Sequence, residues 1–280
     1  MRDQHVAVRV EDGVAVISLD RPQLRNVLSP GSDGTRGQLL AAFSAAEASP
    51  DVAAIVLTST SGDFCAGADL TAATPRLTLA AQHDFVAEAD AFHQALRRTT
   101  MPVIAAVRGY CLGAGLLLAC SADIVLASTT AQFGLPEGRL GLIGASPLVP
   151  LIGRQWAKFL VMTGESIDAW RARDIGLALT VIPDERLDSR SLDLGSRLAR
   201  MPREGLALNK AAIDAIADES GEEAGRVESL SRDALTLQQS AGALAPDGRT
   251  FRDILQAEGM KGLKAAREAQ WSEPWLQDES

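Results

Sequence analysis

The segment from Met101 to Ser128, MPVIAAVRGYCLGAGLLLACSADIVLAS, places the strongest constraint on how this chain can fold. Its apolar runs are continuous rather than alternating, and Gly or Pro bounds them, which is typical of elements buried on both faces. Strand and helix follow each other closely here, and this alternation favours an α/β core. The elements predicted along the segment are a strand at Val103–Val107, a Gly-rich turn at Gly109–Gly115, a helix at Leu116–Cys120 and a second strand at Ile124–Ala127.

The turn in this segment contains Gly109, Gly113 and Gly115. Small residues let a ligand approach the backbone, and the helix that follows directs free N–H groups and its positive dipole end towards the turn. Such a turn can hold a negatively charged oxygen, or it can serve tight packing alone. A dinucleotide loop is a third reading, but that loop normally follows the first strand of its domain. Dehydrogenases with this turn also carry Lys four residues after Tyr, where this chain has Ala114 after Tyr110.

Composition excludes several function classes. The chain has 280 residues, 46% of them hydrophobic, which suffices for one sizeable core. The net charge of −9, without a long Lys/Arg run, argues against nucleic-acid binding. Three cysteines without a CxxC pair argue against a disulfide framework and against a metal site. The N-terminus has no apolar signal region and no apolar stretch is long enough for a membrane span, so we expect a cytoplasmic protein that does not enter membranes.

A second small-residue turn precedes the organising segment. Two alternating runs around Asp12-Gly13 predict a hairpin, Val6–Val10 with Val14–Leu19. A helix is then predicted at residues 38–48 and a buried strand at Val52–Thr58, which leads to FCAGADL at Phe64–Leu70. Two strand ends therefore carry small residues, each able to offer a backbone N–H. Two N–H groups that converge on one oxygen form an oxyanion hole.

Three residues are candidates for acid–base chemistry. Glu137 lies between Pro136 and Gly138 and precedes several apolar residues. A carboxylate in apolar surroundings can have a raised pKa and act as a base near neutral pH, although a surface-loop glutamate gives the same pattern. His83 and His93 fall within a predicted helix from Leu77 to Arg97. Neither has a metal-ligating neighbour at helical spacing, which favours a surface or structural role over catalysis.

The remainder of the chain is predominantly helical by pattern, apart from a short strand ending at Val181–Ile182. A helical C-terminal part of this kind is expected to pack on a neighbour. The predicted helices are Gln155–Thr163, Asp168–Arg173, Leu187–Met201, Leu206–Ala217, Glu222–Gln239 and Phe251–Trp271.

Four motifs together resemble the enoyl-CoA hydratase/isomerase (crotonase) family: FCAGADL, GYCLGAG, AQFGLPEGRLGLI and a late F…EGM…R. They occur in the family's order, and the resemblance extends from LRNVLS at Leu24–Ser29 to Arg267. It implies an α/β fold, a crotonase-like spiral of stacked ββα turns. Residues 1–200 would form the spiral core, and residues 201–280 a helical region that assembles a homotrimer or a dimer of trimers.

The resemblance also implies a site for an acyl-CoA thioester, with CoA as part of the substrate and no further cofactor. The thioester oxygen would lie between the backbone N–H groups of Ala68 and Ala114, with Glu137 as the catalytic carboxylate. Phe251 would close over the CoA of a neighbouring subunit. The other positions implied to contact substrate or CoA are Arg25, Val27, Ala66, Gly67, Asp69, Leu70, Gly113 and Pro136.

One position departs from the hydratase pattern. Hydratases of this family use a second glutamate, and the matching position here is Leu117, which can neither activate nor hold water. A Δ3,Δ2-enoyl-CoA isomerase needs only one carboxylate, which takes a proton from C2 and returns it to C4. This isomerase is the favoured activity. The dienoyl-CoA isomerases of the family add an aspartate eight residues after the glutamate, and this chain has Ala145 there, which disfavours that variant. The alternatives are an enoyl-CoA hydratase of fatty acid β-oxidation, a hydratase-lyase, a thioester hydrolase or decarboxylase, and a catalytically weak acyl-CoA-binding protein.

Overall fold

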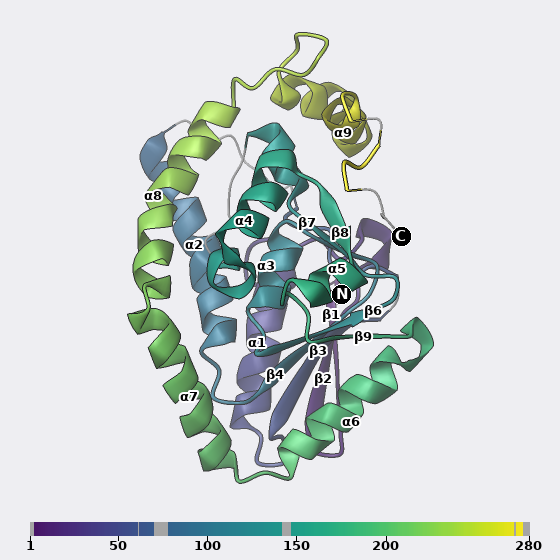
Figure 1. Cartoon of the computed structure of the whole chain (residues 1–280), viewed down its shortest axis with the longest axis vertical. Helices are drawn as coiled ribbons and strands as arrows, with labels where there is room; N and C mark the ends of the chain where they lie inside the picture. Colours follow the sequence, from purple (N-terminus) through teal and green to yellow (C-terminus); the bar gives the residue numbers. More distant parts are fainter. Residues whose placement is uncertain (1–2, 61, 70–77, 142–146, 272, 277–280) are drawn as a thin grey trace.

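The computed structural model describes residues 3–60, 62–69, 78–141, 147–271 and 273–276 (Figure 1). Leu70 and Ala145, both singled out from the sequence, lie outside the described residues. The chain folds into a mixed α/β structure with two sheets. Among the described residues, no helix is both long and apolar enough to cross a membrane, and no group of three or more His, Cys, Asp or Glu side chains could hold a metal ion.

The larger sheet has six strands in the order β1-β2-β3-β4-β6-β9. Only β1 is antiparallel to its neighbour, and it joins β2 through the predicted hairpin. Asp12 and Gly13 both have positive φ, which matches the right-handed twist of the strands that they connect. The strands are β1 Val6–Glu11, β2 Val14–Leu19, β3 Ala54–Ser59, β4 Val103–Val107, β6 Ile124–Ser128 and β9 Thr180–Ile182.

The smaller sheet corrects the sequence prediction for the Gly-rich turn. That turn contains a short strand, β5 Tyr110–Leu112, which pairs with β7 Gln132–Gly134, and β7 pairs in turn with β8 Ser166–Asp168. Sequence periodicity missed all three because a strand of three residues is too short to show alternation. The helix after β5 correspondingly begins at Ala114 rather than Leu116.

Helices cover both faces of the larger sheet. α6 packs on one face, against β2, β3, β4 and β6, while α1 packs near β1 and β2 and α2 lies beyond it (Figure 1). The bounds agree with the sequence predictions to within a few residues, except that α4 begins seven residues earlier than predicted. The helices are α1 Thr35–Ala48, α2 Leu79–Arg97, α3 Ala114–Cys120, α4 Leu148–Thr163, α5 Ala169–Asp174, α6 Leu187–Ala199, α7 Arg203–Glu219, α8 Glu222–Ser240 and α9 Phe251–Glu268.

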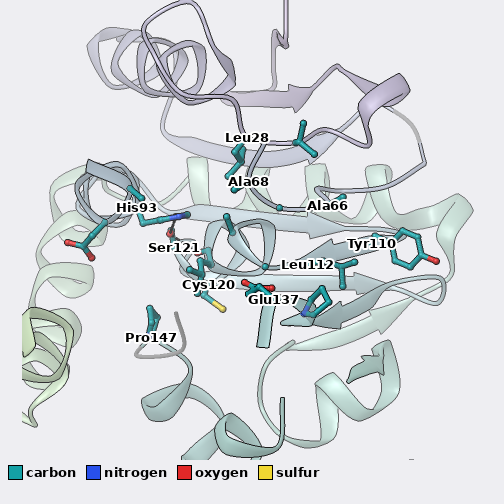
Figure 2. Close-up of a pocket in the computed structure, with 18 of the residues that line it drawn as sticks. Leu28, Ala66, Ala68, His93, Tyr110, Leu112, Cys120, Ser121, Glu137 and Pro147 are labelled. Carbon is teal, nitrogen blue, oxygen red and sulfur yellow. Dashed lines mark hydrogen bonds between the residues drawn. The ribbon is translucent and has the colours of Figure 1, made fainter. Parts of the chain in front are cut away.

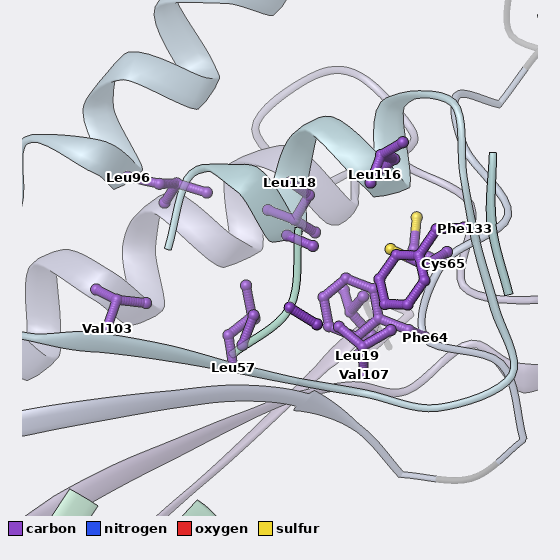
Figure 3. Packing of buried hydrophobic residues seen from close by; sticks show 14 of the residues in the cluster. Leu19, Leu57, Phe64, Cys65, Leu96, Val103, Val107, Leu116, Leu118 and Phe133 are labelled. Atoms are coloured by element: carbon purple, nitrogen blue, oxygen red, sulfur yellow. The ribbon is translucent and has the colours of Figure 1, made fainter. Parts of the chain in front are cut away.

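The main core lies between the larger sheet and α3 (Figure 3). Alternate residues of each buried strand serve opposite faces, so that Leu57 joins this core while Val56 packs towards α6. Phe64 and Phe133 fill the space beside Cys65 (Figure 3). The three cysteines are free thiols in apolar surroundings, as expected, and burial raises the pKa of Cys65 and of Cys120 to about 12.

The C-terminal helices pack on their own chain. α8 lies along α2 over much of its length (Figure 1). α9 contacts the 3-10 helix η3, Pro136–Leu140. The sequence predicted that the C-terminal helices pack on a neighbour, and did not predict these contacts with their own chain. Because α7, α8 and α9 all contribute to one large cavity, they complete the walls that α2 begins.

Candidate functional site

The two small-residue turns lie side by side because short backbone ladders join them. Cys65 donates its N–H to Tyr110 and accepts from Leu112 through its carbonyl, each at 2.9 Å. On the other side, Leu28 donates to Gly67 at 2.8 Å and accepts from Asp69 at 3.1 Å. Segments from three distant parts of the chain therefore run in parallel at the wall of the cavity.

Glycine is required where the turns meet. A Cβ built on Gly115 would lie 2.3 Å from the carbonyl oxygen of Cys65, so any side chain there would push α3 away from the 65–68 turn. Gly67 has a φ of +108°, and a Cβ on it would lie 3.7 Å from the nitrogen of Ala114. The backbones that carry Ala68 and Ala114 thus leave between them little more than the space that one Cβ would fill.

The N–H groups of Ala68 and Ala114 are available to a ligand. Within the residues that the structure describes, neither donates a hydrogen bond to a protein acceptor. Ala114 is the first residue of α3, where N–H groups have no partner inside the helix. Both residues line the cavity.

Glu137 lies beside the second turn (Figure 2). It belongs to η3, and its carboxylate packs on Gly113, the residue before Ala114. Burial raises the pKa of Glu137 to about 7, against smaller lowering contributions from its own backbone N–H and from the charge of Arg267. Although protein atoms surround it, part of the side chain stays accessible from the cavity. A carboxyl group in this state can both accept and return a proton near neutral pH.

The cavity that these groups line has a volume of about 1480 Å³. Leu117 also lines it, on the first turn of α3. The structure therefore brings an apolar side chain, rather than a second carboxylate, to the position that the sequence singled out. The candidate residues that line the cavity are Arg25, Val27, Ala66, Gly67, Ala68, Asp69, Gly113, Ala114, Pro136 and Glu137.

One end of the cavity is framed by polar and cationic groups. Arg25 has its guanidinium 5.1 Å from the centre of the Tyr110 ring and 3.7 Å from Asp63. Phe251 lies at the start of α9 and is absent from the described residues that line the cavity of its own chain. Its implied contact with a neighbouring subunit stays a prediction.

The chain matches a known protein family over most of its length. The family model described as Enoyl-CoA hydratase/isomerase matches residues 9–245. The chain belongs to this family. It is 35% identical over 204 residues to the 2,3-dehydroadipyl-CoA hydratase of Escherichia coli strain K12, covering 71% of this chain and 78% of that one.

Relatives of the enoyl-CoA hydratase/isomerase family differ in the reactions for which they are named. The 1,2-epoxyphenylacetyl-CoA isomerase of Escherichia coli strain K12 is 32% identical over 222 residues, covering 75% of this chain and 82% of that one. The crystal structure of an enoyl-CoA hydratase/isomerase from Xanthobacter autotrophicus Py2 superimposes with a TM-score of 0.88 at 27% identity, over 96% of this chain and 99% of that one.

Two features of this family member escaped sequence analysis. His93 of α2 and Ser121, which follows α3, form a hydrogen-bonded pair in the cavity. The sequence placed His93 on a helix but could not show that it faces Ser121, because the contact joins residues 28 apart. His83, by contrast, is exposed beside Asp84 and does not line the cavity.

The second feature is an ion-pair cluster that attaches α9 to η3. Arg139 pairs with Glu165 at 3.3 Å and with Glu268 of α9, and it stacks 4.4 Å from the centre of the Trp271 ring. Its Nε donates to the carbonyl of Thr163 at 2.9 Å. Because α9 also carries Arg267, this cluster positions the cation that acts on Glu137. The motif LPEGRLGL contained Arg139, but its partners are distant in sequence.

Proposed function

We propose that this family member is a Δ3,Δ2-enoyl-CoA isomerase in which Glu137 moves the proton. The observation that carries the proposal is the carboxyl group of Glu137, whose pKa burial raises to about 7 and which shares the cavity with the N–H groups of Ala68 and Ala114 and with the apolar Leu117. An allylic proton transfer needs one group that is a base in the first half of the reaction and an acid in the second.

The proposed reaction begins with the thioester oxygen bound between the N–H groups of Ala68 and Ala114. Glu137 removes a proton from C2, and the charge that develops on the thioester oxygen is stabilised by the two N–H dipoles. The protonated Glu137 then returns the proton to C4, which moves the double bond from C3–C4 to C2–C3. The proton balance closes on one residue, and no oxidation state changes.

The contacts proposed for the CoA moiety follow the polar end of the cavity. Arg25, Val27, Ala66 and Asp69 lie where residues 25–28 pair with the first turn, and Gly67, Gly113 and Pro136 flank the reacting centre. Leu70 is proposed with them from the family resemblance alone. We propose CoA as part of the substrate and no separate cofactor.

Hydration is the second candidate function, favoured by the name of the 2,3-dehydroadipyl-CoA hydratase relative. Water addition needs a group that holds the water in addition to the base. The apolar Leu117 side chain provides no hydrogen bond for it. We therefore expect hydration to be slow relative to isomerisation.

The test offers the purified protein a 3-enoyl-CoA and, separately, a 2-enoyl-CoA of the same chain length. The two isomers have the same mass, so they are separated by chromatography and the 2-enoyl product is recognised by the ultraviolet absorbance of its conjugated thioester, while hydroxyacyl products are followed by mass. Conversion of the 3-enoyl to the 2-enoyl substrate, lost in Glu137→Gln, is the expected result. Rapid hydroxyacyl-CoA formation would overturn the proposal in favour of the hydratase. Tight binding without exchange of the C2 proton in deuterated water would identify an acyl-CoA-binding protein, and release of free CoA or CO₂ would indicate hydrolysis or decarboxylation.

We also propose a crotonase-like spiral core in residues 1–200 and an assembly region in residues 201–280 that forms trimers or dimers of trimers. Its support is the side of α7 away from the cavity, where Leu208 and Ile216 expose 71% and 65% of their surface. Apolar residues of this kind usually contact another subunit. Light scattering coupled to size-exclusion chromatography should give a trimer or hexamer mass, and Leu208→Asp with Ile216→Asp should lower it. A monomeric wild type would contradict this assembly.

A further inference from the structure

The cavity extends beyond Glu137 along α2. Val86, Ala89, Asp90, His93 and Arg97 all line it, and their spacing places them on one side of the helix. Figure 2 shows Cys120 and Ser121 between Glu137 and His93, with Tyr110 on the opposite side of Glu137. If the CoA moiety enters past Tyr110 and Arg25, the acyl group extends towards His93 and Ser121.

The length of α3 separates this distal end from the reacting centre. Ala114 begins the helix and Ser121 follows its last residue. Seven residues at the helical rise correspond to about 10 Å. A polar pair at that distance is too far from the thioester to take part in proton transfer at C2, and it is placed to contact the end of a medium-length or aryl acyl group.

The hydrogen bonds of Ser121 determine how His93 presents its ring. The Ser121 hydroxyl lies 2.9 Å from the carbonyl of Leu117 and 3.3 Å from Nδ1 of His93. Because a hydroxyl has one proton and the carbonyl is the nearer acceptor, Nδ1 of His93 donates to Ser121. Burial lowers the pKa of His93 to about 3, with a further lowering from the charge of Arg36, so the ring is neutral.

A neutral imidazole that donates through Nδ1 has an acceptor at Nε2. The contact with Ser121 engages Nδ1 and leaves Nε2 on the other side of the ring. His93 retains some surface accessible from the cavity, although protein atoms surround the ring. The distal end therefore offers a hydrogen-bond acceptor to the substrate.

Both carboxylates and cations surround this end of the cavity. Asp90 and Asp233 both line the cavity, and burial together with the charge of Asp90 raises the pKa of Asp233 to about 6. Arg226 is already engaged by Asp90 and Glu223. Arg36 also lines the cavity, about 6 Å from the centres of the Phe85 and Phe92 rings, and its positive charge acts on His93. The carboxylate-terminated thioester in the binding test below therefore measures whether this cation outweighs Asp90 and Asp233.

We infer that His93 and Ser121 form a specificity-determining pair, and that the acyl-CoA substrate carries a neutral hydroxyl group at the distal end of its acyl chain. The hydroxyl donates to Nε2 of His93, while Ser121 holds the ring in the tautomer that accepts. The inference rests on the proposed function for the binding mode of the thioester and adds the substrate class.

Binding is measured first, since it does not depend on the reaction. Titration calorimetry compares three saturated acyl-CoA thioesters of equal medium chain length, ending in a methyl, a hydroxyl or a carboxylate group. We expect the hydroxyl-terminated thioester to bind about tenfold more tightly than the methyl-terminated one, the size of a net hydrogen bond. Equal affinities, or tightest binding of the carboxylate, would overturn the inference.

Variants then assign the preference to the pair. His93→Phe should abolish the preference for the hydroxyl while leaving the affinity for the methyl-terminated thioester within about threefold, and His93→Gln should restore part of it through the amide oxygen. Ser121→Ala should reduce the preference, because nothing then fixes the proton on Nδ1 of His93 and Nε2 is no longer always the acceptor. A preference that survives in His93→Phe contradicts the assignment.

Kinetics on the matching 3-enoyl-CoA pair distinguish the two proposals. A hydroxyl preference in binding without any isomerisation would refute the isomerase and leave the specificity assignment standing. Isomerisation without a hydroxyl preference would support the isomerase and refute the specificity assignment. If His93→Phe lowered kcat for the methyl-terminated substrate about 100-fold or more with KM unchanged, His93 would act in the chemistry and the assignment would be wrong.

Discussion

The carboxylate of Glu137 rests directly on the backbone of Gly113. A Cβ at Gly113 would lie 2.9 Å from Oε1 and 3.0 Å from Oε2 of Glu137, closer than carbon and oxygen atoms approach without displacement. Gly113 also has a φ of +55° and ψ of −125°, a conformation that side chains strongly disfavour. Because Gly113 has no methyl group, the carboxylate of the proposed base can pack on its backbone, next to Ala114.

Gly113→Ala should therefore impair activity more than its small volume suggests. The methyl group displaces Glu137 and strains the turn, so we expect a fall in kcat of about 100-fold and a loss of about 1–3 kcal/mol in the free energy of unfolding. Initial rates and urea unfolding measure the two effects. The control is Gly31→Ala, since Gly31 also has positive φ but meets nothing within 4 Å. Unchanged kcat in Gly113→Ala would refute the contact as a determinant of catalysis.

The free energy of unfolding should depend on pH through Glu137. The pKa of this group is raised from 4.5 to about 7 in the folded chain, so the unfolded state releases the proton first as pH rises. The wild type therefore loses stability relative to Glu137→Gln between pH 4.5 and about 7, and the difference levels off near 3 kcal/mol at most.

Denaturant unfolding of both proteins at a series of pH values measures this difference. The exposed Glu185→Gln is the control and should differ from the wild type by less than about 0.5 kcal/mol throughout. A constant difference between wild type and Glu137→Gln across the range would show that burial does not perturb the Glu137 carboxyl group.

The charge of Arg267 should set the pH dependence of activity. In the wild type, kcat/KM should rise with pH up to about 7 and then level off as Glu137 loses its proton. Arg267 lowers the pKa of Glu137, so Arg267→Met should move the rising limb to higher pH. Arg267→Lys keeps the charge and should leave the profile close to that of the wild type. A rising limb that is the same in all three proteins would rule out this coupling.

Asn26 should stabilise the segment that carries Arg25. It is fully buried with a φ of +56°, it accepts from the N–H of Arg21 at 2.7 Å, and it donates to the carbonyl of Asp63 at 2.7 Å. Asn26→Ala leaves both backbone groups without these partners, so we expect a loss of about 2–4 kcal/mol in unfolding free energy. Asn26→Asp keeps the acceptor and loses the donor, so its unfolding free energy should lie between those of the wild type and Asn26→Ala. Thermal unfolding that is unchanged in Asn26→Ala would contradict this role.

The sequence predicted most of the fold because its buried strands and helices are long enough to show their periods. The runs Val103–Val107 and Ile124–Ala127, and the Asp12-Gly13 hairpin, were each recognisable from residue type and spacing. β5, β7 and β8 were not, since three residues carry no periodic signal. Their pairing depends on β5 lying against the 65–68 turn, a contact between residues about 45 apart.

The residues of the candidate site were likewise predictable from the sequence only in part. Ala68, Ala114, Glu137 and the departure at Leu117 were identifiable from motifs, because each function depends on residue type at a fixed spacing within a short segment. Apolar neighbours made a raised pKa one of two readings for Glu137, the other being a surface-loop glutamate, and burial in the structure raises the pKa. The tertiary structure alone decided the pairing of His93 with Ser121 and the attachment of α9 through Arg139. Those contacts join residues far apart in the chain, and only packing determines which side chains face one cavity.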